Sequence, residues 1–285
     1  MSYASTVPID GELPAPYPED LYRFDQPGRV AESVDQLTEA DFAQFDELGY
    51  LAVRQLLTPD EVAGVLAAMA AVLVRPGEAM IEYEAWAADR VEAASGDERM
   101  DLIRKFMWFV QEDDRLTALA KNDRILSIVR RLCGSEDITM MQDMALLKPP
   151  GGGREKPWHQ DNAFFALEPG TPIVGVWLAL DPATPENGCM HVMPGTHREG
   201  PVVHFRRRDW QLCDEDVDRG RDTMIPLPPG GALFFHGLLQ HGTPANRTDQ
   251  RRRAVQLHYI PVGTPQIPDQ RRLDIFGSEG KDVTC

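Results

Sequence analysis

The chain of 285 residues has few cysteines and little positive charge, and both shortages restrict what it can be. Its four cysteines lie far apart with no Cys-x-x-Cys spacing, so the pattern predicts neither a disulfide framework nor a zinc knuckle. The formal net charge of -16 argues against nucleic acid or an anionic membrane as a partner, because both select a basic surface. We therefore expect no nucleic acid and no membrane among its partners.

Long apolar runs are also absent. The longest nearly unbroken one, residues 62–74, is too short to span a bilayer and is typical of a buried helix. The opening residues, MSYASTVPID, lack a basic start followed by an apolar segment, so we expect no signal peptide. The remaining composition is ordinary for a folded domain. Together these observations favour a soluble cytoplasmic protein.

The first half of the chain carries helical signals. Residues 1–36 are rich in Pro, Gly and acids, and predict an extended arm that wraps the domain or is partly disordered. Capping patterns at Thr38 and Thr58 begin two helices, and apolar residues recur at helical spacing over residues 102–134. We therefore expect residues 37–134 to form a helical support.

The second half of the chain carries strand signals. Residues 135–262 hold short, partly alternating apolar segments separated by Gly- and Pro-rich turns, and residues 263–285 follow as a C-terminal tail. Helices followed by strands predict an α+β, mainly β fold, with a helical support packed on a sandwich or barrel. No linker divides residues 37–285, so we expect one domain.

The stretch Trp158-His-Gln-Asp161 carries the clearest chemical signal. His159 and Asp161 are two residues apart on extended backbone, so both side chains point the same way and reach one metal ion. Such a pair is a weak signal alone. A second histidine from a distant strand, for which His241 is the candidate, completes a two-His, one-carboxylate set that suits non-heme Fe(II). A surface turn at His159 and Asp161, and a purely structural His241, remain the alternatives.

Arg252 begins a predicted strand that covers residues 252–260. An arginine can bind a carboxylate through two parallel hydrogen bonds. Because strand residues alternate between faces, only residues of the same parity share the face of Arg252, and its neighbours Arg251 and Arg253 point the other way. Arg252 is therefore a candidate anchor for a carboxylate ligand.

Together, these motifs resemble the phytanoyl-CoA dioxygenase family of Fe(II)- and 2-oxoglutarate-dependent oxygenases. Their order and spacing agree with the family over residues 38–261. The matching stretches are residues 45–50, 144–150, 158–161, 187–197, 228–236 and 241–243, with Arg252. The resemblance implies a double-stranded β-helix (jelly-roll) core in which His159, Asp161 and His241 hold Fe(II).

The resemblance also implies a binding site for 2-oxoglutarate. Arg252 would anchor its far carboxylate beside the Thr243 hydroxyl, and Trp177, Met144 and Lys105 match family positions that contact it. Core packing explains Trp177 nearly as well, and Met144 fits a gap-filling role.

The implied activity consumes O2 and 2-oxoglutarate, releases succinate and CO2, and oxidises a C–H bond of a small organic molecule. Secondary-metabolite tailoring and an acyl substrate are both compatible with it, and the presence of Asp161 favours hydroxylation or a related oxidation over halogenation. Residues 76–100, 198–223 and the tail would set substrate choice, with residues 76–100 as a possible lid. The alternatives are a cupin-like enzyme with another metal and a family member that binds ligand without turnover. The sequence does not indicate the oligomeric state.

Overall fold

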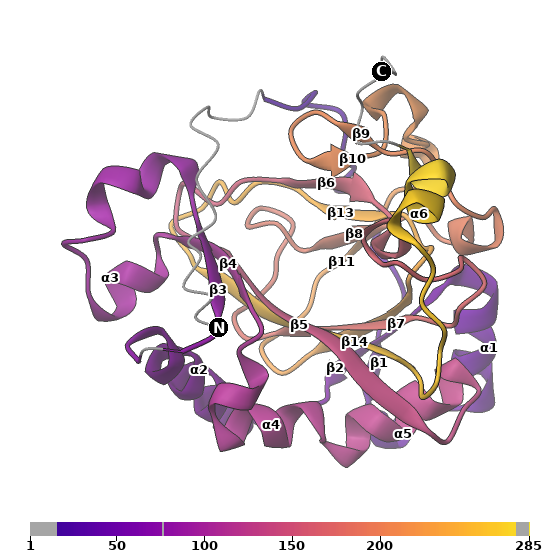
Figure 1. Ribbon diagram of the computed structural model, residues 1–285, viewed down its shortest axis with the longest axis horizontal. Helices are drawn as coiled ribbons and strands as arrows, with labels where there is room; N and C mark the ends of the chain where they lie inside the picture. The colour runs from indigo at the N-terminus through magenta and orange to yellow at the C-terminus, as the bar shows by residue number, and fades with distance from the viewer. Residues whose placement is uncertain (1–15, 76, 278–284) are drawn as a thin grey trace.

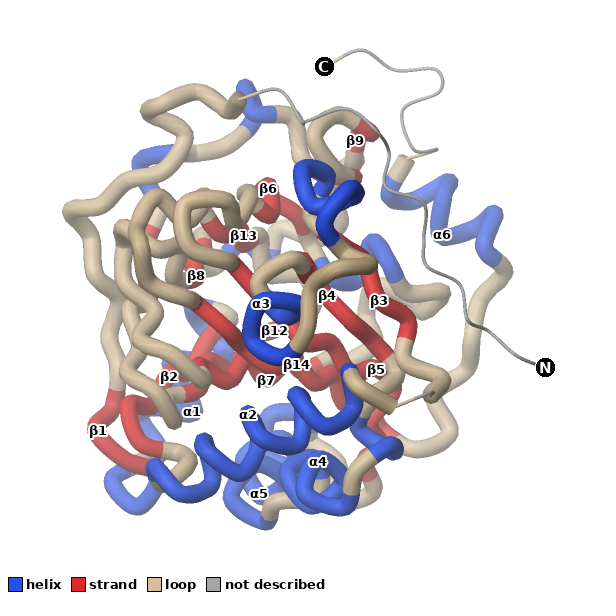
Figure 2. Tube along the Cα trace, turned by 90° about the vertical axis from the view of Figure 1, so that its left-hand side faces the viewer, coloured by secondary structure: helices blue, strands red, loops and turns tan. Residues whose placement is uncertain are grey.

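The computed structural model describes residues 16–75, 77–277 and 285. Two β-sheets face each other, and helices cover the outer side of the larger sheet (Figures 1 and 2). The larger sheet has eight strands, in the order β1 (Ala31–Ser33), β2 (Tyr50–Gln55), β12 (Ala232–His236), β7 (Val174–Ala179), β14 (Arg252–Pro261), β5 (Ile138–Lys148), β4 (Ile103–Met107) and β3 (Met80–Tyr83). All neighbours in it are antiparallel except β1 and β2.

The smaller sheet has four antiparallel strands, in the order β11 (Thr223–Ile225), β8 (Met190–Val192), β13 (His241–Thr243) and β6 (Lys156–His159). A short hairpin joins β9 (Phe205–Arg206) and β10 (Trp210–Gln211). The α-helices are α1 (Glu39–Leu48), α2 (Pro59–Leu73), α3 (Gly96–Met100), α4 (Asp114–Ala120), α5 (Asp123–Cys133) and α6 (Asp269–Phe276). Within the described ranges, no helix is long and apolar enough to cross a membrane.

Local sequence signals begin the first two long helices. The Thr38 backbone N–H donates to Asp41 at 2.8 Å before α1, and the Thr58 N–H donates to Glu61 at 2.7 Å before α2. Both are capping boxes, which satisfy N–H groups that have no partner inside the helix. Helix α1 ends at Gly49, whose φ of 82° lies in the left-handed region that glycine adopts without strain. The predicted starts of both helices are confirmed.

The long strand β14 divides the core between its two faces. Val255 and Leu257 pack with the helices that cover the larger sheet, in the main apolar cluster. Ala254 belongs to a second cluster between the two sheets, and the next residues on that face, Gln256 and His258, are buried polar groups. The functional side chains therefore come from the space between the sheets. The facing sheets confirm the predicted mainly β, jelly-roll core.

Two strands lie in regions that the sequence did not identify as strands. Residues 102–134, expected to be mostly helical, contain α4 and α5 but begin with β4, and β3 lies within residues 76–100. These strands extend the larger sheet because β4 pairs with β5 and β3 pairs with β4. Strand β4 is only five residues long and adjoins helical sequence, so periodicity alone could not separate it from a helix.

The described part of the N-terminal arm packs against the domain. Leu21 and Tyr22 are buried. The Tyr22 ring stacks on Trp158 with the centroids 5.4 Å apart, and its hydroxyl donates to Glu155 at 2.8 Å. These contacts are compatible with the wrapping alternative, and the extended arm itself stays a prediction. Residues 1–15 lie outside the described part of the chain.

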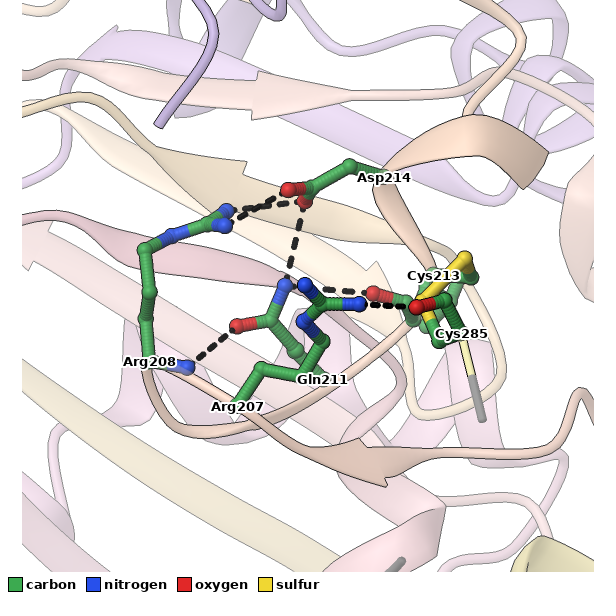
Figure 3. The surroundings of a disulfide bond; sticks show 7 residues. Arg207, Arg208, Gln211, Cys213, Asp214 and Cys285 are labelled. Atoms are coloured by element: carbon green, nitrogen blue, oxygen red, sulfur yellow. Dashed lines mark hydrogen bonds and ion pairs between the residues drawn. A yellow bond between two sulfur atoms is a disulfide. The ribbon is translucent and has the colours of Figure 1, made fainter. Parts of the chain in front are cut away.

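One disulfide corrects the expectation drawn from cysteine spacing. Cys213 and Cys285 are bonded across a sequence separation of 72 residues (Figure 3). Arg207 donates to the backbone carbonyl oxygen of Cys285 beside the bond. The remaining cysteines, Cys133 and Cys189, are free and buried. Cysteines this far apart in the sequence form no recognisable spacing motif, so their pairing could be identified only from the three-dimensional structure.

Candidate active site

Three side chains that could hold a metal meet between the sheets. His159 ends β6, Asp161 begins the short 3-10 helix η4 (Asp161–Phe164), and His241 begins β13 directly opposite His159. Their nearest ligand atoms all lie within 4.8 Å of one another, and all three residues are buried. The structure thus brings together the predicted triad. Gly242 follows His241, and a Cβ there would lie 3.1 Å from the carbonyl oxygen of Lys156, so a small residue lets β13 approach β6 closely.

Backbone carbonyls orient both histidines in the same way. The Nδ1 of His159 lies 2.8 Å from the carbonyl oxygen of Pro157, and the Nδ1 of His241 lies 2.8 Å from that of Leu239. A carbonyl only accepts, so each Nδ1 carries the hydrogen and each Nε2 offers a lone pair. Burial lowers the pKa of His241 to about 3, which keeps its ring neutral at neutral pH.

Asp161 is held by two residues that the sequence analysis missed. Its Oδ2 accepts hydrogen bonds from Gln256 Nε2 at 3.0 Å and from His258 Nε2 at 2.7 Å. Its Oδ1 points to the histidines, 3.3 Å from His159 Nε2 and 3.6 Å from His241 Nε2. Burial alone would raise the pKa of Asp161, but His241 and His258 hold it well below its usual value. Asp161 is therefore an oriented carboxylate with one oxygen left for a metal.

A cavity of about 290 Å³ opens beside the triad. Its wall combines apolar and cationic side chains from β4, β5, β7, β13 and β14. All the residues predicted for the metal and co-substrate sites line it, namely Lys105, Met144, His159, Asp161, Trp177, His241, Thr243 and Arg252. Phe164 and Phe165 line it too.

Arg252 brings a buried positive charge to this cavity. The side chain lies over Trp177, with 5.4 Å between the guanidinium carbon and the ring centroid. Among the described residues, its hydrogen bonding is limited to one long contact, 3.4 Å from Nη1 to the carbonyl oxygen of Leu146, and Nε has no partner. Burial lowers its pKa to about 10, so the group is still charged at neutral pH. The indole N–H of Trp177 is also buried without a partner. An anionic ligand would satisfy both donors.

Lys105 and the suggested lid segment are less available to a ligand in the cavity. Lys105 reaches the cavity wall, but its ammonium pairs with Glu82 at 3.0 Å. Among the described residues of the suggested lid segment 76–100, none lines the cavity: Met80, Ile81 and Tyr83 lie in β3, and Trp86 donates to the carbonyl oxygen of Gly152 at 3.1 Å.

One known protein family matches the part of the chain that forms this site. The profile of the family described as phytanoyl-CoA dioxygenase (PhyH) matches residues 45–254, about three quarters of the chain. The chain belongs to the phytanoyl-CoA dioxygenase family. The match contains the triad and Arg252 but ends before Gln256 and His258.

Individual relatives in the phytanoyl-CoA dioxygenase family are moderately similar. The rat protein "Phytanoyl-CoA dioxygenase, peroxisomal" is 30% identical over 230 residues, which cover 75% of this chain and 66% of the rat protein. The Caenorhabditis elegans protein "Probable phytanoyl-CoA dioxygenase" is 30% identical over 182 residues, 59% of this chain and 56% of that protein. The matches thus span less than two thirds of these two relatives.

A solved structure shares both fold and moderate identity. EvdO2 from Micromonospora carbonacea var. aurantiaca, complexed with 2-oxoglutarate, aligns with a TM-score of 0.62 and 25% identity over 82% of this chain and 98% of EvdO2. The carbocyclase SnoK from nogalamycin biosynthesis aligns with a TM-score of 0.66 at 21% identity, covering 89% of this chain and 97% of SnoK, which shows the shared fold.

Proposed function

We propose that this protein is an Fe(II)- and 2-oxoglutarate-dependent oxygenase that oxidises a C–H bond of a small organic molecule. Family membership and a 25% identical solved relative complexed with 2-oxoglutarate support the proposal. The observation that carries it is the buried set of His159, Asp161 and His241 at one end of a cavity that also contains Arg252.

The three side chains fit a metal in charge and orientation. Two imidazoles present Nε2, and one carboxylate presents Oδ1, a donor set that leaves coordination positions open and is used by non-heme Fe(II) oxygenases. Bound iron would supply the redox chemistry that couples O2 and 2-oxoglutarate consumption to oxidation of the substrate. Gln256 and His258 keep Asp161 oriented for this task, as outer hydrogen bonds do in metal sites.

The cavity residues fit a dicarboxylic co-substrate. Arg252 offers N–H groups that no carboxylate of the described residues occupies. A carboxylate bound there would replace the hydration that the buried guanidinium lacks. Arg252, Trp177 and Thr243 therefore bind and position 2-oxoglutarate under this proposal, and the apolar wall excludes water.

Phe164 marks the side from which the primary substrate approaches. Its ring meets His159 edge-on at 5.7 Å and is 39% exposed, while also lining the cavity. Trp210 also packs edge-on against this ring, with the centroids 5.1 Å apart. An aromatic surface beside a metal ligand and open to solvent suits an organic molecule whose C–H bond must lie near the metal.

The cytoplasmic location expected from the sequence remains a prediction. Disulfides are rare in reducing compartments, so the bond between Cys213 and Cys285 is the feature that weighs against it. A small-molecule substrate without nucleic acid or membrane partners also remains the expectation.

Turnover of the co-substrate tests the proposal. Succinate release from 2-oxoglutarate is measured with Fe(II) and O2 across a panel of small organic substrates, for the wild type and for Asp161→Ala. We expect succinate that depends on Fe(II), on O2 and on Asp161. No succinate with any substrate, together with no binding of 2-oxoglutarate to the iron-loaded wild type, would contradict the proposal and favour the non-catalytic or cupin-like alternatives.

A further inference from the structure

A second buried cation lies directly opposite Arg252. Strands β5 and β14 lie side by side (Figure 1). In their register, Lys148, the last residue of β5, pairs with Arg252, the first residue of β14. Residues paired in this way point to the same face of a sheet. Both side chains are buried, with relative exposures of 4% for Lys148 and 2% for Arg252, and both line the cavity.

This arrangement is unfavourable without an anion. Like charges directly opposite one another destabilise a strand pair, and a buried charge without a partner costs several kcal/mol. Among the described residues, no carboxylate forms an ion pair with either cation within 4.0 Å. Lys148 Nζ donates only to the backbone carbonyl oxygen of Arg154. Burial and the neighbouring Arg252 together lower the pKa of Lys148 well below its usual value.

The nearest acidic groups already have other partners. Glu155 accepts from Arg208 at 2.7 Å and from the Tyr22 hydroxyl at 2.8 Å. Glu84 lies 3.6 Å from Arg154. Both carboxylates raise the pKa of Lys148 somewhat, but less than burial and Arg252 lower it. Burial and Arg252 therefore disfavour the charged form of Lys148, and an anionic ligand placed between the two groups would favour it again.

The position of the pair selects which part of a ligand it meets. Gln256, which contacts the metal-binding Asp161, lies four residues further along β14 than Arg252. At about 3.4 Å per residue, the two Cα atoms are roughly 14 Å apart. Lys148 and Arg252 thus lie at the end of the cavity away from the triad. A group that reaches them cannot be the 2-oxo acid head that would bind at the metal.

We propose that Lys148 is a second cationic contact for the far carboxylate of 2-oxoglutarate, which lies between its ammonium group and the guanidinium of Arg252. This inference rests on the proposed function. Arg252 supplies planar, paired N–H donors, whereas Lys148 supplies a compact charge on a flexible stem. The same pair distinguishes 2-oxo acids with a far carboxylate from those without one.

Binding of two 2-oxo acids separates this role from a structural one. Calorimetry measures the dissociation constants of 2-oxoglutarate and of 2-oxobutyrate, which lacks the far carboxylate. The full chain is loaded with Mn(II) in place of Fe(II), so that the bound acids are not consumed by turnover with O2. Lys148→Met should weaken 2-oxoglutarate binding about tenfold to hundredfold, the range expected for a hydrogen bond to a charged group, and leave 2-oxobutyrate binding unchanged. Lys148→Arg, which keeps the charge, should recover part of the loss.

Lys121→Met is the matched control, because Lys121 is exposed at the end of α4, outside the cavity wall. It should bind both acids like the wild type. If Lys148→Met weakens the binding of both acids equally, Lys148 acts only through the loop at Arg154. If the binding of neither acid changes, Lys148 does not contact the co-substrate. Both results overturn the inference. If the wild type itself fails to bind 2-oxoglutarate, the proposed function fails first.

Discussion

Replacing Gln256 should weaken metal binding even though Gln256 contacts no metal. Its amide donates to Asp161 Oδ2 at 3.0 Å, and the only other side chain that does so is His258, at 2.7 Å, within the described residues. Gln256→Met nearly preserves the volume of the side chain but removes this donor. Asp161 then keeps one of its two supports and turns more freely away from the orientation that presents Oδ1.

The size of the effect follows from the hydrogen bond that is lost. A hydrogen bond to a charged group contributes about 1.5–3 kcal/mol, and about 1.4 kcal/mol corresponds to a tenfold change in affinity. Removing an outer hydrogen bond of a metal ligand typically costs about 10- to 100-fold in metal affinity. We expect Gln256→Met to bind Fe(II) about tenfold or more weakly than the wild type.

The assay is an anaerobic titration of Fe(II) into metal-free protein, repeated with Mn(II). The matched control is Gln142→Met, because Gln142 lines the same cavity from β5 and lies opposite His258 in the strand register, yet has no hydrogen bond to Asp161. The control should bind metal like the wild type. A Gln256→Met affinity within twofold of wild type, or an equal loss in the control, would refute the reasoning.

Three further results are expected. Burial alone would raise the pKa of Glu82, but Arg104 and the other basic neighbours lower it from 4.5 to about 2. Above pH 4.5 the ionised Glu82 therefore contributes roughly 3 kcal/mol to the free energy of unfolding, and this contribution is lost as the pH falls toward 2. Urea unfolding should show Glu82→Gln less stable at pH 7 and the gap closing on acidification; a gap independent of pH would contradict this. Cys213→Ser should lower the free energy of unfolding by about 2–4 kcal/mol, because the bond to Cys285 closes a long loop, and reductant should produce the same loss in the wild type only. Trp177→Phe should weaken 2-oxoglutarate binding about fivefold to tenfold in calorimetry, because its buried N–H has no protein partner, whereas unchanged affinity would leave Trp177 with a packing role alone.

Local sequence patterns predicted the parts of the site that are local. His159 and Asp161 are only two residues apart in the chain, and the capping boxes at Thr38 and Thr58 span only four residues each. His241 and Arg252 lie far from this pair; their strand-like surroundings made them candidates, and the resemblance to a known family supported their place beside it. The spacing of His159 and Asp161 and the two capping boxes can be recognised without knowing which strands pair.

The missed features depend on tertiary contacts. Gln256 and His258 share the parity of Arg252, so the sequence placed them on the correct face, but nothing in it showed that this face meets Asp161. Lys148 lies in a stretch that matches the family, yet its pairing with Arg252 requires the strand register. The missed strands and the long-range disulfide have the same cause, because each is defined by a partner distant in the sequence.

The most direct test of the account is the visible spectrum of the anaerobic protein with Fe(II) and then 2-oxoglutarate. The account predicts a weak charge-transfer band that requires both additions, is absent in Asp161→Ala, and needs much more 2-oxoglutarate in Arg252→Ala. No band in the iron-loaded wild type, with Arg252→Ala behaving identically, would contradict the assignment of this cavity as an iron and 2-oxoglutarate site.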